Sequence, residues 1–375
     1  MISILIAGDF APENRVVEKL DERRYADVLG EVIPIVGQVD YALVNLESPI
    51  VEGAGTPIKK IGPNLKCSKA VIGAMQYAGF NGVTLANNHF YDYGEEGALT
   101  TMSLLSKDNI DFVGAGRNLM EASKVLYRTI GDKIFAFINC CENEYSIATE
   151  TTAGSNPEDP IRQYYAIKEA RDKSDFIIVI VHGGIEGYQL PTPRMQDLYR
   201  FFIDCGADVV VNHHQHCYSG YEEYNSKRIF YGLGNFCFDQ CGVYQQSWYE
   251  GCFLKLIFEG SSIGYELIPY IQCKAEPRIE IVKDVGVFNS NIALLNAIIC
   301  DQASLDAEYR HFLDETINSQ KYVLCPYRNK YLAALYVRGY LPGLLPIHRW
   351  RTLQNKIICE SHRDRFVYFL NNKLK

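Results

Sequence analysis

Long apolar runs and a basic leader are both missing from this chain of 375 residues. No apolar run approaches the roughly 18 residues that a membrane-spanning helix needs. The N-terminal stretch Met1–Asp9 has neither a basic region nor a small-residue cleavage site. We therefore expect a buried strand there rather than a secretion signal, and a cytoplasmic protein that is at most peripheral to the inner membrane.

Cysteine pairs at metal-binding spacing are also missing. The twelve cysteines are scattered along the chain and contain no Cys-x-x-Cys pair. In a chain of this length, such a pattern fits neither a disulfide scaffold nor a structural zinc site. We therefore expect reduced, mostly buried thiols. The sequence contains no internal repeat or low-complexity tract either.

An excess of positive charge is missing from the chain as a whole. Its formal net charge of −8 argues against nucleic-acid binding by bulk electrostatics. The charge is uneven, because residues 320–375 hold 11 basic and 2 acidic residues, which leaves −17 on the rest. Tyrosines are interleaved with these cations. Two explanations stay open for this basic part: contact with an anionic polymer or a membrane surface, or a solvated helical face docked on the acidic body.

Strand-length apolar runs alternate with amphipathic helical patterns over the first two thirds of the chain. This alternation predicts an α/β fold whose sheets are buried on both faces. We expect strands at 2–7, 41–45, 82–86, 134–139, 176–181, 209–212 and 229–232, helices at 68–77, 97–107 and 193–205, and a hairpin at 252–270. Beyond about residue 280 the patterns are helical, at 289–300, 304–317, 328–340 and 348–370. The sequence therefore predicts a first domain, 1–278, and a helical basic C-terminal region, 279–375.

Residue types that bind metal ions follow five of the expected strands. In chain order they are Asp9, Glu47, Asn88 with His89, His182, and His214 with His216. Because the carboxyl ends of strands in an α/β sheet converge on the ligand crevice, we expect these side chains to gather there. Singly, each has a plain structural explanation, such as a helix cap or a buried histidine. The last two are harder to explain in this way, because alternate positions of an extended segment place both imidazoles on one face.

Longer motifs surround these residues, namely Asn45–Glu47, Ala86–Gly94, His182–Tyr188, Cys205–His216 and Ile229–Phe236. Together they resemble the capsule-synthesis CapA family, which is associated with poly-γ-glutamate capsules and looks like a branch of the calcineurin-like metallophosphoesterases. The resemblance runs from residue 2 to about residue 240. It implies a sandwich of two mixed β-sheets flanked by helices, to which this chain would add a helical C-terminal appendage.

The resemblance also implies a role for each candidate residue. Glu47 takes the place of a carboxylate that bridges two metal ions. His89 would not bind metal, but would stabilise or protonate the leaving oxygen of a substrate. The remaining ligands would be Asp9 and His216 for one ion, and Asn88, His182 and His214 for the other.

Two positions depart from the pattern of the superfamily. A histidine usually stands two residues after the first aspartate, where this chain has Ala11, so one ion would be short of a ligand. A tryptophan often follows the strand-end histidine, where this chain has Gly183, which predicts a wider pocket.

Carboxylate, amide-oxygen and imidazole ligands without thiolates suit Mn²⁺, Fe²⁺ or Zn²⁺. A pair of such ions would hold a bridging hydroxide and neutralise the charge of an in-line displacement. Glu186, four residues beyond His182, would take part in catalysis by orienting an imidazole or the substrate, or is a surface carboxylate. Lys60, Tyr188 and Asn235 are candidate substrate-binding residues, with a solvated loop as the alternative for Lys60 and a turn for Asn235.

Three functions are compatible with this site. The first is a metal-dependent hydrolase of phosphoesterase type that acts on an anionic metabolite or polymer of the capsule or envelope. The second is a γ-glutamyl or other amide hydrolase on the same metals. The third is a non-catalytic protein that binds or assembles capsule polymer, which Ala11 and the basic C-terminal region favour. A nuclease ranks last because the body of the protein is acidic.

Overall fold

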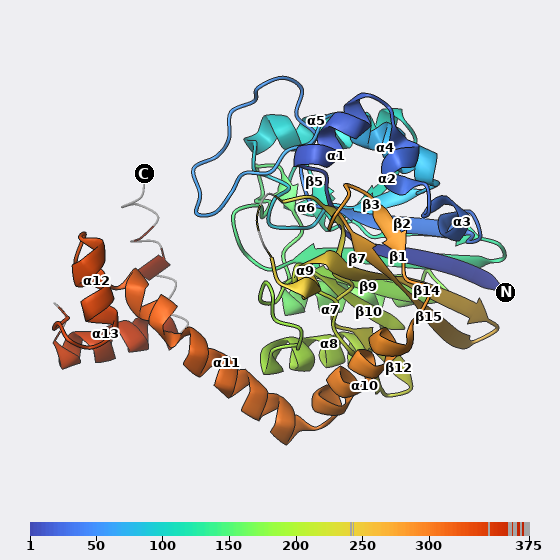
Figure 1. Ribbon diagram of the computed structural model, residues 1–375. Coiled ribbons are helices and arrows are strands. Elements are labelled where there is room, and N and C mark those ends of the chain that lie inside the picture. Colours follow the sequence, from blue (N-terminus) through green and yellow to red (C-terminus); the bar gives the residue numbers. More distant parts are fainter. Residues whose placement is uncertain are drawn as a thin grey trace. The chain divides into compact units, whose positions relative to one another are not determined.

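The computed structural model describes residues 1–240, 242, 244–343, 346–358, 362, 366, 367 and 370. The chain divides into two compact units, Met1–Asp306 and Ala307–Lys375. The first unit has four layers, in which two β-sheets lie face to face and helices cover the outer face of each sheet (Figure 1). The predicted α/β fold, with two mixed sheets flanked by helices and further helices at the C-terminus, is confirmed.

The first sheet is mixed and contains eight strands among the described residues. Its central strand β1 (Ile2–Ala11) pairs in parallel with β2 and β13 and antiparallel with β14. The order is β16 (Ile279–Ile281), β15 (Ser262–Gln272), β14 (Glu250–Glu259), β1, β2 (Tyr41–Leu46), β3 (Gly82–Thr84) and β4 (Asp111–Val113), with β13 (Asn235–Phe238) off this path beside β1. The predicted hairpin is therefore the β14–β15 pair.

The second sheet is also mixed. Its order in the described residues is β11 (Tyr221–Tyr224), β12 (Lys227–Phe230), β10 (Val209–His213), β9 (Phe176–His182), β7 (Lys133–Cys141) and β6 (Leu126–Ile130). A small separate pair is formed by β5 (Ala115–Gly116) and β8 (Gly154–Ser155). Strands β9 and β10 run parallel in a register that sets His182 opposite His213, so both strands end at the same edge.

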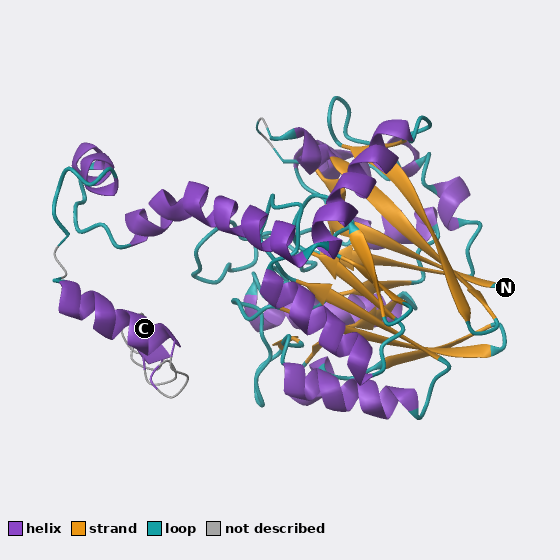
Figure 2. Ribbon diagram, turned by 90° about the horizontal axis from the view of Figure 1, so that it is seen from below, coloured by secondary structure: helices purple, strands orange, loops and turns teal. Residues whose placement is uncertain are grey.

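Helices cover the outer faces, as Figure 2 shows in purple on either side of the orange strands. Those that pack on the first sheet are α1 (Asn14–Asp21), α2 (Tyr25–Leu29), α3 (Ile33–Val36), α4 (Ala70–Ala78) and α5 (Gly94–Lys107). The second sheet is covered by α7 (Pro160–Arg171), α8 (Pro193–Cys205) and α10 (Gly286–Cys300). Two short helices, α6 (Leu119–Ala122) and α9 (Gln246–Tyr249), lie in connections.

Side-chain alternation along the strands builds three apolar layers. In β9, Ile178 and Ile180 face the first sheet, whereas Ile177 and Val179 face the helices on the other side. Every residue of this strand is buried, as the continuous apolar run predicts for a strand covered on both faces. Packing on both faces therefore fixes the positions of the carboxyl ends of the strands.

The C-terminal helices divide between the two units. Helix α10 belongs to the first unit, because Phe288, Ile292 and Ile299 are buried in its core. The compact first unit thus extends beyond residue 278, where the sequence places the domain boundary. The second unit contains most of α11 (Gln302–Val323), together with α12 (Lys330–Val337) and α13 (Ile347–Ile358). Most of the predicted helix beyond residue 358 lies outside the described residues.

Two further expectations concern the whole chain. The ten cysteines in the described part carry free thiols, and eight of them are buried, as predicted. Cys241 and Cys359 lie outside the described residues. Across the described chain, no helix combines the length and the apolar character that are needed to cross a bilayer.

Candidate metal centre

The ends of β1, β2, β9 and β10 meet at one edge, where the predicted ligands come together. Asp9 lies near the end of β1, Glu47 directly follows β2, and His182 ends β9. The loop after β3 delivers Asn88, and the bend after β10 delivers His214 and His216. All six side chains are buried. Residues that are more than two hundred positions apart in sequence therefore form one cluster.

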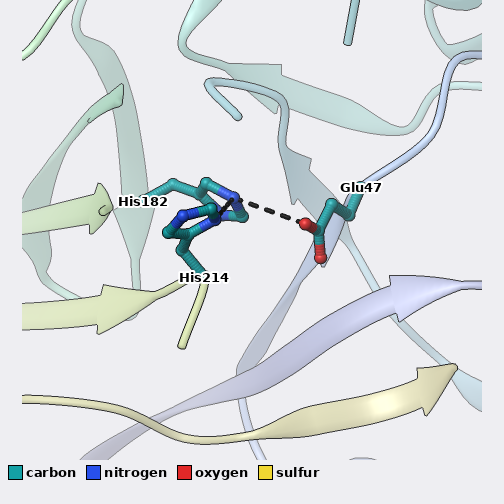
Figure 3. Close-up of side chains that lie close together, drawn as sticks. All are labelled: Glu47, His182 and His214. Carbon is teal, nitrogen blue, oxygen red and sulfur yellow. Dashed lines mark hydrogen bonds and ion pairs between the residues drawn. The ribbon is translucent and has the colours of Figure 1, made fainter. Parts of the chain in front are cut away.

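Three ligand-type atoms lie close to the ring nitrogen Nε2 of His182. His182 Nε2 lies 3.0 Å from Asn88 Oδ1, 3.1 Å from His214 Nδ1 and 3.5 Å from Glu47 Oε1. Figure 3 shows the two imidazoles beside each other with the Glu47 carboxylate directed at them. Two ring nitrogens, an amide oxygen and a carboxylate oxygen at this spacing form a set that suits a divalent cation.

A second group shares Glu47. Its members are Asp9, Glu47 and His216, whose ligand atoms lie within 4.8 Å of one another. Asp9 Oδ2 is 3.6 Å from His216 Nδ1, and Glu47 Oε1 is 3.8 Å from His216 Nε2. Because the same carboxylate belongs to both groups, Glu47 stands where a ligand that bridges two ions would stand.

Burial leaves the carboxylate of Glu47 unsatisfied. Its side chain is fully buried, and neither carboxylate oxygen has a hydrogen-bond partner. A buried carboxylate without a partner is strongly unfavourable unless a cation or a proton neutralises it. The residues present therefore fit a pair of divalent metal ions.

Burial changes the protonation of the cluster when no cation is bound. Burial, followed by the Glu47 charge, raises the pKa of Asp9 to about 8, and burial raises the pKa of Glu47. Burial and the neighbouring imidazoles hold the pKa values of His182 and His214 well below their usual range, so both rings are neutral. Burial alone would lower the pKa of His216, but the two carboxylates outweigh it and raise that pKa. Metal ions bind ionised carboxylates and neutral imidazoles, so His182 and His214 are already in the binding form, whereas an ion here would displace protons from Asp9, Glu47 and His216.

The backbone of the last two histidines differs from the sequence prediction. His214 and His216 do not lie on an extended segment, because β10 ends at His213 and the chain bends there. Both have left-handed backbone conformations, with φ of +90° and +55°. Such conformations are costly for residues with a side chain and are concentrated at functional sites. The imidazoles converge because of this bend, not because of strand alternation.

Two asparagines orient the ligands. Asn45 Nδ2 donates to Asp9 Oδ1 at 2.7 Å and lies 3.3 Å from His182 Nδ1. Asn235 Oδ1 is 2.8 Å from His216 Nδ1, and its amide nitrogen donates to the carbonyl of His216 at 3.3 Å. Asn235 is fully buried and holds the imidazole of His216. Its role in substrate binding stays a prediction.

His89 lies in a separate network beside the cluster. Its Nδ1 is 2.6 Å from Asp92 Oδ2 and 3.1 Å from Lys60 Nζ. Lys60 also forms an ion pair with Asp92, and both side chains are buried. The alternative of a solvated loop is therefore wrong for Lys60, whose ammonium group pairs with Asp92. Its role in substrate binding stays a prediction. The sequence prediction missed Asp92, although its spacing of three residues from His89 was a usable signal.

His213 is a second residue that the sequence prediction missed. It ends β10, and its Nδ1 lies 3.5 Å from Asp9 Oδ1. Both ring nitrogens are buried without a hydrogen-bond partner, and burial lowers the pKa of this histidine to about 3. A neutral ring therefore packs behind Asp9.

The loop after β9 carries the remaining predicted residues. Glu186 is exposed, with its carboxylate close to His214 and His216. Tyr188 is half-buried and packs against the apolar layer below β9, while its carbonyl accepts a bond of 2.7 Å from Gln215 Nε2. The structure thus directs Glu186, but not the ring of Tyr188, toward the cluster.

Gly183 does not widen the pocket. A Cβ atom at this position would lie 2.7 Å from Cγ of Glu142, whose side chain fills the space and pairs with Arg194. The expectation of a wider pocket is therefore wrong, because a carboxylate occupies the space that a large residue at position 183 would need.

The chain belongs to the family of the bacterial capsule synthesis protein PGA_cap, whose model matches residues 3–240. The resemblance inferred from the motifs is therefore confirmed. The chain is 33% identical over 244 residues to the PGA biosynthesis protein CapA of Bacillus subtilis (strain 168), with 64% of each chain covered. It is 30% identical over 247 residues to the capsule biosynthesis protein CapA of Bacillus anthracis, covering 64% of this chain and 60% of that protein. The matched regions therefore span about three fifths of these relatives.

Solved structures with a similar course of the chain include a novel phosphatase from Mycoplasma pneumoniae. Its TM-score is 0.45 at 15% sequence identity, and the match covers 72% of this chain and 93% of that one.

Proposed function

We propose that this protein is a metal-dependent hydrolase of phosphoesterase type that acts in the synthesis of a poly-γ-glutamate capsule or another cell-envelope polymer. The observation that carries this proposal is Glu47, a fully buried carboxylate without a hydrogen-bond partner that is shared by two groups of ligands. Membership of the capsule-synthesis family supports the biological setting. The substrate would be an anionic metabolite or polymer, and the protein would work in the cytoplasm or at the inner surface of the membrane.

Two divalent ions, Mn²⁺, Fe²⁺ or Zn²⁺, would be held by the two groups that share Glu47. Bound there, such ions lower the pKa of a coordinated water and neutralise charge on a phosphoryl oxygen. The side chains of the protein supply the rest. Asn45 and Asn235 hold Asp9 and His216 in place, and the bend after β10 presents the imidazoles of His214 and His216.

His89 would act on the leaving group. Nδ1 donates to Asp92, whose other carboxylate oxygen accepts from Lys60, which fixes the ring and leaves Nε2 as the atom that can pass a proton to a leaving oxygen. This arrangement separates the residue that handles the proton from the residues that bind metal.

Hydrolysis of aryl phosphate monoesters and diesters in the presence of Mn²⁺ tests the proposal. We expect activity in the wild-type protein and a loss of at least about 100-fold in Glu47→Gln and His214→Ala, because each removes a metal ligand. The matched control is Glu169→Gln, which changes an exposed carboxylate on α7 that pairs with Lys173. Absence of wild-type activity, or its survival in both site variants, would contradict the proposal.

A second candidate keeps the metals but cleaves a γ-glutamyl or other amide. It is favoured by the pairing of Lys60 with Asp92, which leaves this buried cation neutralised rather than free for a phosphate. Incubation with poly-γ-glutamate distinguishes the two reactions. Shortening of the polymer without phosphatase activity would support the amide hydrolase.

A third candidate is a non-catalytic role in binding or assembling polymer, through the basic C-terminal region. Exposed Tyr331, Tyr340 and Ile357 lie among its cations and favour a surface contact with an anionic polymer, the capsule machinery or a membrane. Co-sedimentation of the full chain with anionic and with neutral vesicles tests the membrane contact. Equal binding to both kinds of vesicle, or to neither, would contradict it.

A further inference from the structure

The two groups of metal ligands are unequal in the described residues. One contains four ligand atoms, from Glu47, Asn88, His182 and His214. The other contains three, from Asp9, Glu47 and His216. An ion in the second group would therefore need a further ligand from outside this set.

Position 11, just beyond Asp9 on β1, cannot supply it. Ala11 is fully buried and packs with Leu65, Phe238 and Trp248 in a small apolar cluster. The rings of Phe238 and Trp248 also contact His216, with centroid distances of 5.3 and 5.0 Å. Apolar side chains thus occupy this side of His216, and a polar ligand must come from elsewhere.

Glu186 approaches His216 from an exposed turn. Its carboxylate and the ring nitrogens of His214 and His216 lie within 4.8 Å of one another. Asp9 is fully buried, whereas Glu186 is exposed, so the two carboxylates reach the cluster from the interior and from solvent.

Hydrogen bonds hold the turn that carries Glu186. The amide of Tyr188 donates to the carbonyl of Ile185 at 3.1 Å, and Gly187 has φ of +74°, as a type II turn requires at its third position. Gly187 N donates to the carbonyl of Gln215 at 2.8 Å, and the Gln215 amide donates back to the carbonyl of Tyr188 at 2.7 Å. The turn is thereby tied to the buried residue between the two histidines.

We propose that Glu186 is the carboxylate ligand that completes the binding site of the ion held by Asp9, Glu47 and His216. The inference rests on the metal pair of the proposed function. It assigns to Glu186 direct contact with a metal ion, rather than the orientation of an imidazole or of the substrate.

Mn²⁺ binding to the full-length protein tests this assignment without reference to activity. The protein is treated with a chelator and dialysed, and bound Mn²⁺ is then counted by elemental analysis across a concentration series. We expect two ions in the wild type. In Glu186→Gln we expect one ion to bind as before and the other to bind at least about 10-fold more weakly, since the loss of a ligand costs at least as much as the loss of a supporting residue.

Two further variants sharpen the test. Glu186→Asp keeps a carboxylate on a shorter side chain and should retain part of the second affinity. Glu144→Gln removes an exposed carboxylate from the loop after β7 and should bind both ions as the wild type does. Thermal melting of each variant without metal shows that its fold is retained.

The outcomes separate this inference from the proposed function. Two ions with unchanged affinities in both the wild type and Glu186→Gln would overturn the ligand assignment alone. A wild-type protein that binds no Mn²⁺ would overturn both.

Discussion

At the residue scale, the burial of Glu47 affects both the stability of the fold and the candidate metal site. A carboxylate that is fully buried, with neither oxygen hydrogen-bonded, destabilises the folded chain unless a cation neutralises it. The neighbouring charges of His216, His89 and Lys60 offset only part of this burial, and the pKa of Glu47 stays raised. Without a bound cation, the folded chain is therefore destabilised at the position where the two groups of ligands meet.

This cost can be measured. We expect Glu47→Gln to raise the free energy of unfolding of the metal-free protein by roughly 1–3 kcal/mol at pH 8, because an amide is less costly to bury than a carboxylate. Urea unfolding in the presence of a chelator measures the difference. A Glu47→Gln protein that is less stable than the wild type under these conditions would show that other contacts satisfy the carboxylate.

A second buried carboxylate lies away from the metal ligands. Burial, followed by the charge of Glu142, raises the pKa of Glu158 to about 7, although Arg194 lies 3.2 Å away. The folded protein therefore binds a proton more tightly than the unfolded chain between about pH 4.5 and pH 7. In this window the stability contributed by protonated Glu158 is lost as the pH rises.

The unfolding free energy of the wild type should fall between pH 5 and pH 8. We expect this fall to be smaller in Glu158→Gln by up to roughly 3 kcal/mol, at about 1.4 kcal/mol for each pKa unit. Urea unfolding at both pH values measures it. Glu169→Gln, on an exposed ion pair, should keep the wild-type dependence. A wild-type dependence in Glu158→Gln would show that this carboxyl titrates normally in the fold.

At the element scale, the packing of β1 against β13 sets the position of Asp9. A Cβ atom on Gly8 would lie 1.9 Å from the carbonyl oxygen of Gly234, and Asp9 N donates to that same carbonyl at 3.1 Å. Only glycine at position 8 allows the two backbones to lie this close. The site therefore depends on a contact between strands that carries no catalytic side chain.

Gly8→Ala should destabilise the protein by roughly 2–4 kcal/mol and weaken Mn²⁺ binding, because the strand must move and take Asp9 with it. Gly264→Ala, in an exposed position of β15, is the control, since a Cβ there has its nearest neighbour at 3.8 Å. Thermal melting and metal counting check both variants. Equal stability of the two would contradict the close packing.

At the scale of the whole molecule, the metal ligands come from both sheets. Asp9 and Glu47 extend from the first sheet, whereas His182, His214 and His216 extend from the second. Bound ions would join the two layers at the edge where like-charged and unpaired side chains face one another. Metal binding should therefore stabilise the first unit as a whole.

We expect chelation to lower the melting temperature of the wild-type protein, since a ligand at 100 times its dissociation constant stabilises the folded state by about 2.7 kcal/mol. Differential scanning calorimetry with Mn²⁺ and with a chelator measures the shift. Glu47→Gln should show little change between the two conditions. A similar shift in that variant would place the stabilising ions elsewhere.

The sequence by itself determined the alternation of strands and helices, the burial of the central strands and the strand-end positions of the ligand-type residues. These follow from local apolar patterns, which report burial directly. The motifs around Asn88 and His214 also identified the family, because several ordered motifs together are specific. The boundaries of the C-terminal helices were harder to predict from the sequence, since α10 is buried by contacts with strands that are distant in sequence.

Only the tertiary structure decided how the side chains meet. The left-handed bend at His214 and His216, the pairing of Lys60 with Asp92, and the filling of the space at Gly183 by Glu142 could not be inferred from the local apolar patterns. A local pattern indicates which face of an element is buried, but not which partner occupies it. Orientation and pairing in the site are therefore properties of the folded chain.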